Sequence, residues 1–259
     1  MWNKIWFKIN NTIVGNALLI AVFSLLSKIF GLFRERLIAH NFGASELSDI
    51  YYSAFRLPDL IFNTLVLGAL TSAFIPVFQK TWEKNKEKGL ILANSVLNLF
   101  LIVIISLVIL AIIFAPQLMR FITPGFNEIQ LIQVISLTRV MLLSIIFFVI
   151  SNIIGGVLNS WKKFFSFSLA ASFYNIGIII GIIYFYPLLG LIGLAWGVFL
   201  GALLHLLIQL PEAYKNGWSY LFTIKITKEL NTNVSSRIKK LDMNAATFIL
   251  QGAINYLSN

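Results

Sequence analysis

Long apolar segments, separated by short polar stretches, recur along the whole chain. Six of them contain about 20 residues, the number that a helix needs to cross the hydrocarbon core of a bilayer. The pattern predicts six transmembrane helices, near residues 12–33, 50–79, 90–115, 131–158, 166–186 and 190–210. A further apolar stretch, 243–259, stops with the chain after too few residues to cross, and it is predicted as the start of a seventh helix. The expected fold class is an all-α integral membrane protein.

Composition supports a membrane protein and excludes most other classes. Hydrophobic residues make up 58% of the chain and charged residues 12%, with a mean hydropathy of +0.85. A soluble globule of 259 residues could not bury that much apolar surface. Cysteine is absent, and His40 and His205 have no partner at metal-ligand spacing, so neither a metal nor a cofactor is expected. The acids are scattered, which argues against a Mg²⁺-dependent enzyme acting on polyprenyl phosphates.

The net charge of +10 is interpreted as a topology signal, and nucleic acid is not an expected partner. Most of the 20 Lys and Arg residues fall in alternate connections of the six-helix pattern, at 4–8, 80–88, 162–163 and 215–240. Cytoplasmic loops carry such an excess. The sequence therefore predicts a multi-pass protein of the cytoplasmic membrane whose N-terminus is cytoplasmic.

Three units are expected along the chain. Residues 1–211 form a six-helix transmembrane lobe, and 243–259 begin the seventh helix. Between them, 212–242 has the mixed polarity of an amphipathic cytoplasmic linker lying on the membrane surface, although a solvated loop fits the same pattern equally well.

Charged side chains inside the first two spans are the strongest functional signal, because an ionised group is costly there. These residues are Lys28, Arg34, Glu35, Arg36, Asp49, Arg56 and Asp59. Asp49, Arg56 and Asn63 follow one another at intervals of seven, which places them on one helical face. Pro58 interrupts that helix and frees the carbonyl of Ala54.

Two interpretations of these charges stay open. Asp49 forms an ion pair with Arg34 or Arg56 that only joins helices, or the excess of cations binds an anion. A phosphate or pyrophosphate suits the second, because Arg binds it through a planar fork and Lys as a point charge.

Five motifs follow one another along the chain: SKIFGLFRERLIAHNFGASELSDIYYSAFRLPDL, GALTSAFIPVF, TPGF, GGVLNSWKKF and GLAWGVFLGALLHLLIQLP. Together they resemble the MurJ/MviN family of lipid II flippases, within the multidrug/oligosaccharidyl-lipid/polysaccharide exporter superfamily. The resemblance covers nearly the whole chain. It implies one lobe of a two-lobed flippase that works by alternating access on a lipid-linked oligosaccharide pyrophosphate, with the peptidoglycan precursor lipid II as the expected substrate. A second lobe or another copy of the chain would be its partner; a non-transporting scaffold or an exporter of another lipid-linked saccharide is the alternative.

Carried over from that resemblance, the substrate-binding residues are Lys28, Arg34, Asp49, Arg56 and Asn63. Lys28 stands where the family has an arginine, and Arg34 and Asp49 match it. Asn63 replaces a family arginine and Leu67 a common acid, while Arg56 on the same stripe compensates in part for Asn63. Arg36 and Arg139 are secondary candidates, and Arg139 either faces the cavity or extends to the membrane interface.

Small and amide residues predict how the helices pack. Gly177 and Gly181 repeat at the same interval as Gly193, Gly197 and Gly201, a spacing that favours close helix contact. Asn152, Asn159, Asn175 and Gln209 are interpreted as interhelical hydrogen-bond partners rather than substrate ligands.

Overall fold

The computed structural model describes residues 13–67 and 74–224, which are helical apart from short connections and the extended end at 218–224. Five helical stretches in these ranges are long and apolar enough to cross a membrane, which confirms the all-α membrane fold. They are Val14–Phe42, Lys86–Ile113, Glu128–Ser160, Phe165–Leu189 and Ile192–Lys215. The predicted second span, 50–79, includes residues 68–73, which lie outside the described ranges, so the number six stays a prediction.

The elements differ from the predicted spans mainly at their ends. They are α2 (Ile13–Phe42), α3 (Glu46–Ile61), the π-helix η1 (Phe62–Leu67), α4 (Ile75–Lys84), α5 (Lys86–Ile113), α6 (Ala115–Ile122), α7 (Glu128–Ser160), α8 (Phe165–Ile180), the π-helix η3 (Gly181–Phe185), α9 (Tyr186–Leu189), α10 (Ile192–Leu207) and α11 (Leu210–Lys215). Helix α6 was not predicted, and Pro116 lies in its first turn. The capping box of Asn127 and Gln130 then begins α7.

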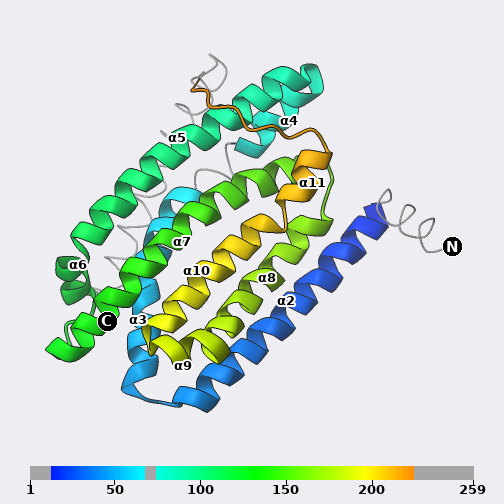
Figure 1. Ribbon diagram of the computed structural model, residues 1–259. Coiled ribbons are helices and arrows are strands. Elements are labelled where there is room, and N and C mark those ends of the chain that lie inside the picture. The colour runs from blue at the N-terminus through cyan, green and yellow to red at the C-terminus, as the bar shows by residue number, and fades with distance from the viewer. Residues whose placement is uncertain (1–12, 68–73, 225–259) are drawn as a thin grey trace, which may run out of the picture.

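Five helices lie side by side in the order α2, α8, α10, α7 and α5, and α3 packs on α7 (Figure 1). The two ends of this bundle differ in charge. Helices α4 and α11 and the start of α5 lie at one end, which carries Lys84, Lys86 and Lys215 (Figure 1). Helices α6 and α9 and the turn between α2 and α3 lie at the other. The bundle thus separates the basic connections from the opposite ones, as the alternating pattern predicts.

Helices α8 and α10 approach closely because glycines line both sides of their contact. A Cβ atom built on Gly197 would lie 2.6 Å from the Cα atom of Gly181, and one built on Gly177 would overlap the backbone of Gly201. Since Gly181 and Gly197 meet backbone to backbone, no side chain can move aside to make room. The close packing predicted from the glycine spacing is confirmed.

Helix α2 presents an apolar stripe outward. Leu18, Leu25 and Leu32 are spaced by seven and are 57%, 61% and 74% exposed. The other side of α2 packs on α8. Such a stripe is suited to lipid or to another apolar surface.

Pro58 disturbs α3 as its position predicts. The Ala54 carbonyl cannot receive the usual backbone hydrogen bond, because Pro58 has no N–H. The buried hydroxyl of Thr138 on α7 donates to that carbonyl instead, at 3.3 Å. Four residues after Pro58 the helix widens into η1. The hydrogen bond from Thr138 therefore holds α3 against α7 at the point where the backbone hydrogen bonds of α3 are interrupted.

Two buried asparagines of α5 hold the extended segment 218–224, which lies within the predicted linker. Asn94 donates to the Ser219 carbonyl at 2.9 Å and accepts from the Leu221 backbone N–H at 3.2 Å. Asn98, one turn later, donates to the carbonyls of Leu221 and Thr223 at 3.1 and 3.0 Å. Glu212–Lys215 of the predicted linker belong to α11, and residues 225–259, including the predicted seventh helix, lie outside the described ranges. The linker and seventh helix therefore stay predictions.

We expect Asn98→Ala to release segment 218–224 from α5. The change removes two amide donors and the acceptor of the Tyr220 hydroxyl. At about 1 kcal/mol per hydrogen bond, deuterium uptake over 218–224 should rise about tenfold or more. Asn152→Ala is the matched control, because that amide donates only to Phe148 of its own helix. Equal uptake in Asn98→Ala and the parent chain would mean that the asparagines do not hold the segment.

Candidate functional site

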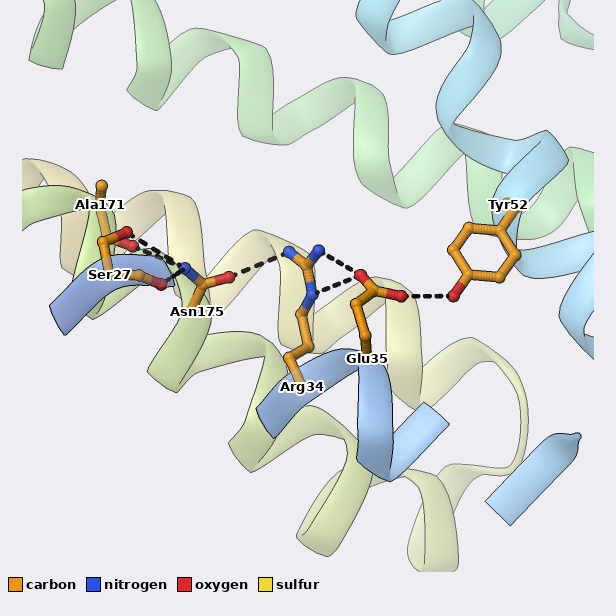
Figure 2. A network of polar contacts seen from close by, with 6 residues as sticks. All are labelled: Ser27, Arg34, Glu35, Tyr52, Ala171 and Asn175. Carbon is orange, nitrogen blue, oxygen red and sulfur yellow. Dashed lines mark hydrogen bonds and ion pairs between the residues drawn. The ribbon is translucent and has the colours of Figure 1, made fainter. Parts of the chain in front are cut away.

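Arg34 joins α2 to α8 inside the bundle. Its Nη1 donates to the side-chain oxygen of Asn175 at 3.0 Å, and Asn175 uses its own amide group on the carbonyls of Ala171 and Ser27, at 3.1 and 3.3 Å (Figure 2). Asn175 is buried, so this set of bonds fixes its orientation and thereby that of the guanidinium. The prediction that Asn175 is an interhelical hydrogen-bond partner is confirmed.

Glu35 connects the same arginine to α3. One of its carboxylate oxygens accepts from Nε of Arg34 at 3.1 Å and forms an ion pair with Nη2. The other oxygen accepts from the Tyr52 hydroxyl at 2.7 Å (Figure 2). We call Ser27, Arg34, Glu35, Tyr52 and Asn175 the Arg34 network. It links the consecutive helices α2 and α3 to α8, which lies more than a hundred residues later in the chain.

The guanidinium of Arg34 is partly buried, but not all of its N–H groups donate hydrogen bonds. Its side chain is 24% exposed, against 43% for Glu35. The hydrogen bonds just described use three of its five N–H groups, so two have no acceptor among the described residues. At about 1.5 Å per residue, Arg34 also lies roughly 12 Å from the end of α2, inside the span. An oriented guanidinium with free donors at that depth is a ready partner for an anionic oxygen.

The structure corrects one of the two interpretations of the charges. In the described residues Asp49 forms an ion pair with neither Arg34 nor Arg56, and Arg34 pairs with its sequence neighbour Glu35 instead. Asp49 is exposed in the first turn of α3, where an acid is favourable for the helix dipole. Its separation from the arginines leaves the Arg34 network without the acid expected from the sequence.

Lys28 and Arg36 are exposed on α2. Lys28 precedes Glu35 by seven residues and therefore lies on the same side of α2 as the carboxylate that reaches α3. Neither cation forms an ion pair with a described residue. The described residues of α2 as a whole thus carry more positive than negative charge.

The side chains of Arg56 and Arg139 each contact the C-terminal end of another helix. Arg56 donates to the carbonyl of Ile122, the last residue of α6, at 3.3 Å. Arg139 donates to the carbonyl of Ile112, in the last turn of α5, at 3.2 Å. Unpaired carbonyls at a helix C-terminus attract cations, so each arginine has a local structural role. Both side chains keep further donors and both residues are exposed.

A cavity of about 320 Å³ lies between α3 with η1 on one side and α7, α8 and α10 on the other. Of the Asp49, Arg56 and Asn63 stripe, only Asn63 lines it. The lining residues are Phe55, Pro58, Asp59, Phe62, Asn63, Met141, Ser144, Ile145, Phe148, Tyr174 and Val198. Tyr174 lines the cavity from α8 and directly precedes Asn175 of the Arg34 network.

Sequence reasoning missed Tyr52, Ser144 and Tyr174 as parts of this region. Tyr52 donates its hydroxyl proton to Glu35 and so connects α3 to the Arg34 network. The hydroxyl of a tyrosine in a helix bundle usually finds a hydrogen-bond partner, yet nothing in the spacing of Tyr52 identifies Glu35 as that partner. Gln209, in contrast, was predicted as an interhelical partner, and its amide group donates to Ser151 of α7.

Comparison with known proteins places these features in one family. The sequence profile described as "Lipid II flippase MurJ" matches residues 38–259. The "Probable lipid II flippase MurJ" of Buchnera aphidicola subsp. Schizaphis graminum is 35% identical over 211 residues, covering 78% of this chain and 40% of the relative.

Solved structures agree on the fold. The chain is 30% identical to "Lipid II flippase MurJ, inward closed conformation", with a TM-score of 0.68 over 85% of this chain and 46% of that one. It also matches "Crystal structure of MATE in the bent conformation" with a TM-score of 0.68 at 17% identity, covering 93% of this chain and 56% of that one. The second likeness concerns the fold alone. The chain spans about two fifths of the curated relative and just under half of the solved flippase.

Proposed function

Because the chain belongs to the lipid II flippase MurJ family, we propose that it forms one lobe of a transporter that moves lipid II across the cytoplasmic membrane. The observation that carries this proposal is the guanidinium of Arg34, which is oriented by Asn175 and Glu35 and keeps two N–H groups for a ligand. A pyrophosphate presents oxygens that match such a fork. The reaction is a change of access between two states, without covalent chemistry.

The charge balance supports an anionic ligand. Glu35 compensates Arg34, and the described residues of α2 add Lys28 and Arg36 without a further acid. Cations inside a span are stabilised when an anion joins them. Lys28, Arg34 and Arg36 are therefore the proposed pyrophosphate ligands on α2, with Asn63 and Asp49 on the α3 side. Arg56 and Arg139 use their remaining donors toward the substrate.

We also propose an orientation of the bundle in the membrane and a partner for its exposed surfaces. The basic end of the bundle, with α4 and α11, faces the cytoplasm together with the N-terminus. The exposed α2 stripe and the open side of the cavity are covered by a second lobe or by another copy of the chain. The curated relative is more than twice as long as the matched region, which supports the first of these.

Binding of lipid II by the purified chain in lipid nanodiscs tests the function. We expect lipid II to bind at least tenfold more tightly than the uncharged polyprenol of the same chain length, since charge-assisted hydrogen bonds contribute about 1.5–3 kcal/mol. Equal affinity for the two lipids would contradict an anion-binding role.

Lys28 gives a sharper form of the same test. Lys28→Gln should weaken lipid II binding about tenfold, because it removes a point charge, whereas Lys28→Arg should preserve or improve it. Lys84→Gln, on exposed α4 at the other end of the bundle, is the matched control and should bind as the parent does. If Lys28→Gln also binds as the parent does, Lys28 has no phosphate contact.

A further inference from the structure

Helix α5 carries two buried amides in an otherwise apolar span. Its residues 90–113 include no charged side chain, and Asn94 and Asn98 are 0% and 2% exposed. A polar group within hydrocarbon is costly unless it is hydrogen-bonded, so each amide needs a partner. The extended segment 218–224, which leaves α11 and reaches α5 (Figure 1), supplies that partner.

The position of the two amides on α5 gives the depth of the segment that they hold. At about 1.5 Å per residue, residues 90–113 extend over about 36 Å, slightly more than a hydrocarbon core of about 30 Å. A core centred on this stretch begins near Leu92, so Asn94 lies roughly 3 Å and Asn98 roughly 9 Å inside its boundary. Segment 218–224 therefore lies below the level of Lys86 and Lys88, at the edge of the hydrocarbon.

Extended backbone at that depth needs hydrogen-bond partners. The amides of Asn94 and Asn98 bind the carbonyls of Ser219, Leu221 and Thr223 and the N–H of Leu221, at 2.9–3.2 Å. Alternate residues of an extended chain direct their backbone groups to opposite edges. Tyr220 and Phe222 accordingly form no backbone hydrogen bond with a described residue. Only water can satisfy these groups, which limits the segment to the boundary between headgroups and acyl chains.

The side chains of the segment suit the same boundary. Residues 218–224 include no charged side chain. Tyr220, Leu221, Phe222 and Ile224 are all exposed, and Phe222 is the most exposed of them at 76%. Aromatic side chains are enriched where headgroups meet acyl chains. The Tyr220 hydroxyl stays bonded to Asn98 at 2.9 Å, so its ring can enter the boundary without leaving a buried donor unpaired.

We propose that segment 218–224 inserts into the headgroup–acyl boundary of the membrane, as an extended element anchored to α5 by Asn94 and Asn98. Its partner is the lipid bilayer. The segment descends from Ser219 towards Thr223, because Asn98 follows Asn94 by one turn, about 6 Å along α5. This inference depends neither on lipid II nor on which side of the membrane the basic end faces.

Spin labels on single cysteines test the insertion, since the chain has no cysteine of its own. Phe222→Cys and Ser219→Cys are labelled in vesicles of phosphatidylethanolamine and phosphatidylglycerol. Collision with oxygen, which concentrates in acyl chains, is compared with collision with a water-soluble nickel chelate. We expect the label at 222 to lie about 5–10 Å inside the boundary, and the label at 219 up to about 6 Å less deep.

Two exposed positions calibrate the measurement. Lys84→Cys, on α4 at the same end of the bundle, should collide mainly with nickel, and Ile105→Cys, midway along α5, mainly with oxygen. A label at 222 that behaves like the one at 84 would mean a solvated segment. Low collision with both reagents would mean that protein covers it, and equal depth at 219 and 222 would mean a flat one. Each result would overturn the proposal.

Asn98→Ala in the Phe222→Cys chain tests the anchor. The variant removes the bonds to the carbonyls of Leu221 and Thr223, so the label at 222 should move towards water and collide more with nickel. Asn152→Ala, whose amide bonds only within its own helix, should leave the label where it is. An unchanged depth in Asn98→Ala would show that α5 does not set the position of the segment.

Discussion

Gly197→Ala should destabilise the bundle by about 3 kcal/mol or more, the upper range for overpacking. The new methyl group would lie 2.6 Å from the Cα atom and 3.2 Å from the nitrogen of Gly181. Both atoms belong to the backbone, so the strain cannot be relieved by a rotamer change, and α10 has to separate from α8 and η3. Unfolding of the purified chain in a mixed detergent series measures the loss.

Gly31→Ala is the control for this substitution. It adds the same methyl group within a helix, but its nearest neighbour is the Asn175 side chain at 3.8 Å, an ordinary contact. Alanine has a higher helix propensity than glycine by up to about 1 kcal/mol, and no steric clash cancels this gain at position 31. The variant should therefore be as stable as the parent or more stable. If Gly197→Ala were equally well tolerated, the helices would not be in the close contact described.

The contact between α8 and α10 shows what the sequence predicts well. Glycines at intervals of four on two neighbouring spans indicate two smooth helical faces, and a short connection makes those helices antiparallel. That combination pairs the late glycine of one helix, Gly181, with an early one of the next, Gly197. The prediction succeeds because it depends on local spacing and on a short loop, both of which are visible in the chain.

The partner of Arg34 shows where sequence reasoning fails. Asp49 was the acid in the ion-pair interpretation, whereas adjacent residues on a helix, such as Arg34 and Glu35, do not usually face each other. Glu35 nevertheless reaches Arg34, and its second oxygen is bound by Tyr52 of α3. Long side chains from one helix can meet at the boundary with a second helix. Whether Glu35 or Asp49 reaches Arg34 there depends on how each helix is rotated about its axis. Nothing in the order of residues specifies that rotation.

The predicted stripe of Asp49, Arg56 and Asn63 was incomplete for a related reason. It assumed one regular α-helix from Asp49 to Asn63, whereas η1 begins at Phe62. Arg56 donates to the last carbonyl of α6, a helix that was not predicted. Asn63 alone of the stripe lines the cavity, and Asp59, one of the charged residues of the predicted second span, lines it as well.

Arg34→Ala should lower the affinity for lipid II by at least tenfold while the chain still inserts and folds. The loss has two sources, because both the positive charge and the two uncommitted N–H groups disappear. The stability of the folded chain should fall by less than the affinity for lipid II. Asn175 loses one partner of its oxygen but keeps the bonds of its amide group, and Glu35 keeps Tyr52 and is partly exposed to solvent. One unsatisfied buried acceptor costs about 1–3 kcal/mol.

Three variants separate ligand binding from helix packing at this position. Arg34→Lys keeps the charge but loses the planar fork, so its affinity should fall between those of the parent and Arg34→Ala. Asn175→Ala removes the contact of Arg34 with α8 but leaves the guanidinium in place. For this variant we therefore expect a larger loss of stability for a given loss of lipid II affinity than for Arg34→Ala. Arg120→Ala, an exposed arginine paired with Glu128 beyond the end of α5, controls for the loss of one positive charge and should bind as the parent does. Full lipid II affinity in a folded Arg34→Ala chain would reduce the Arg34 network to a helix clamp, because a group that binds the pyrophosphate cannot be removed without a loss of affinity.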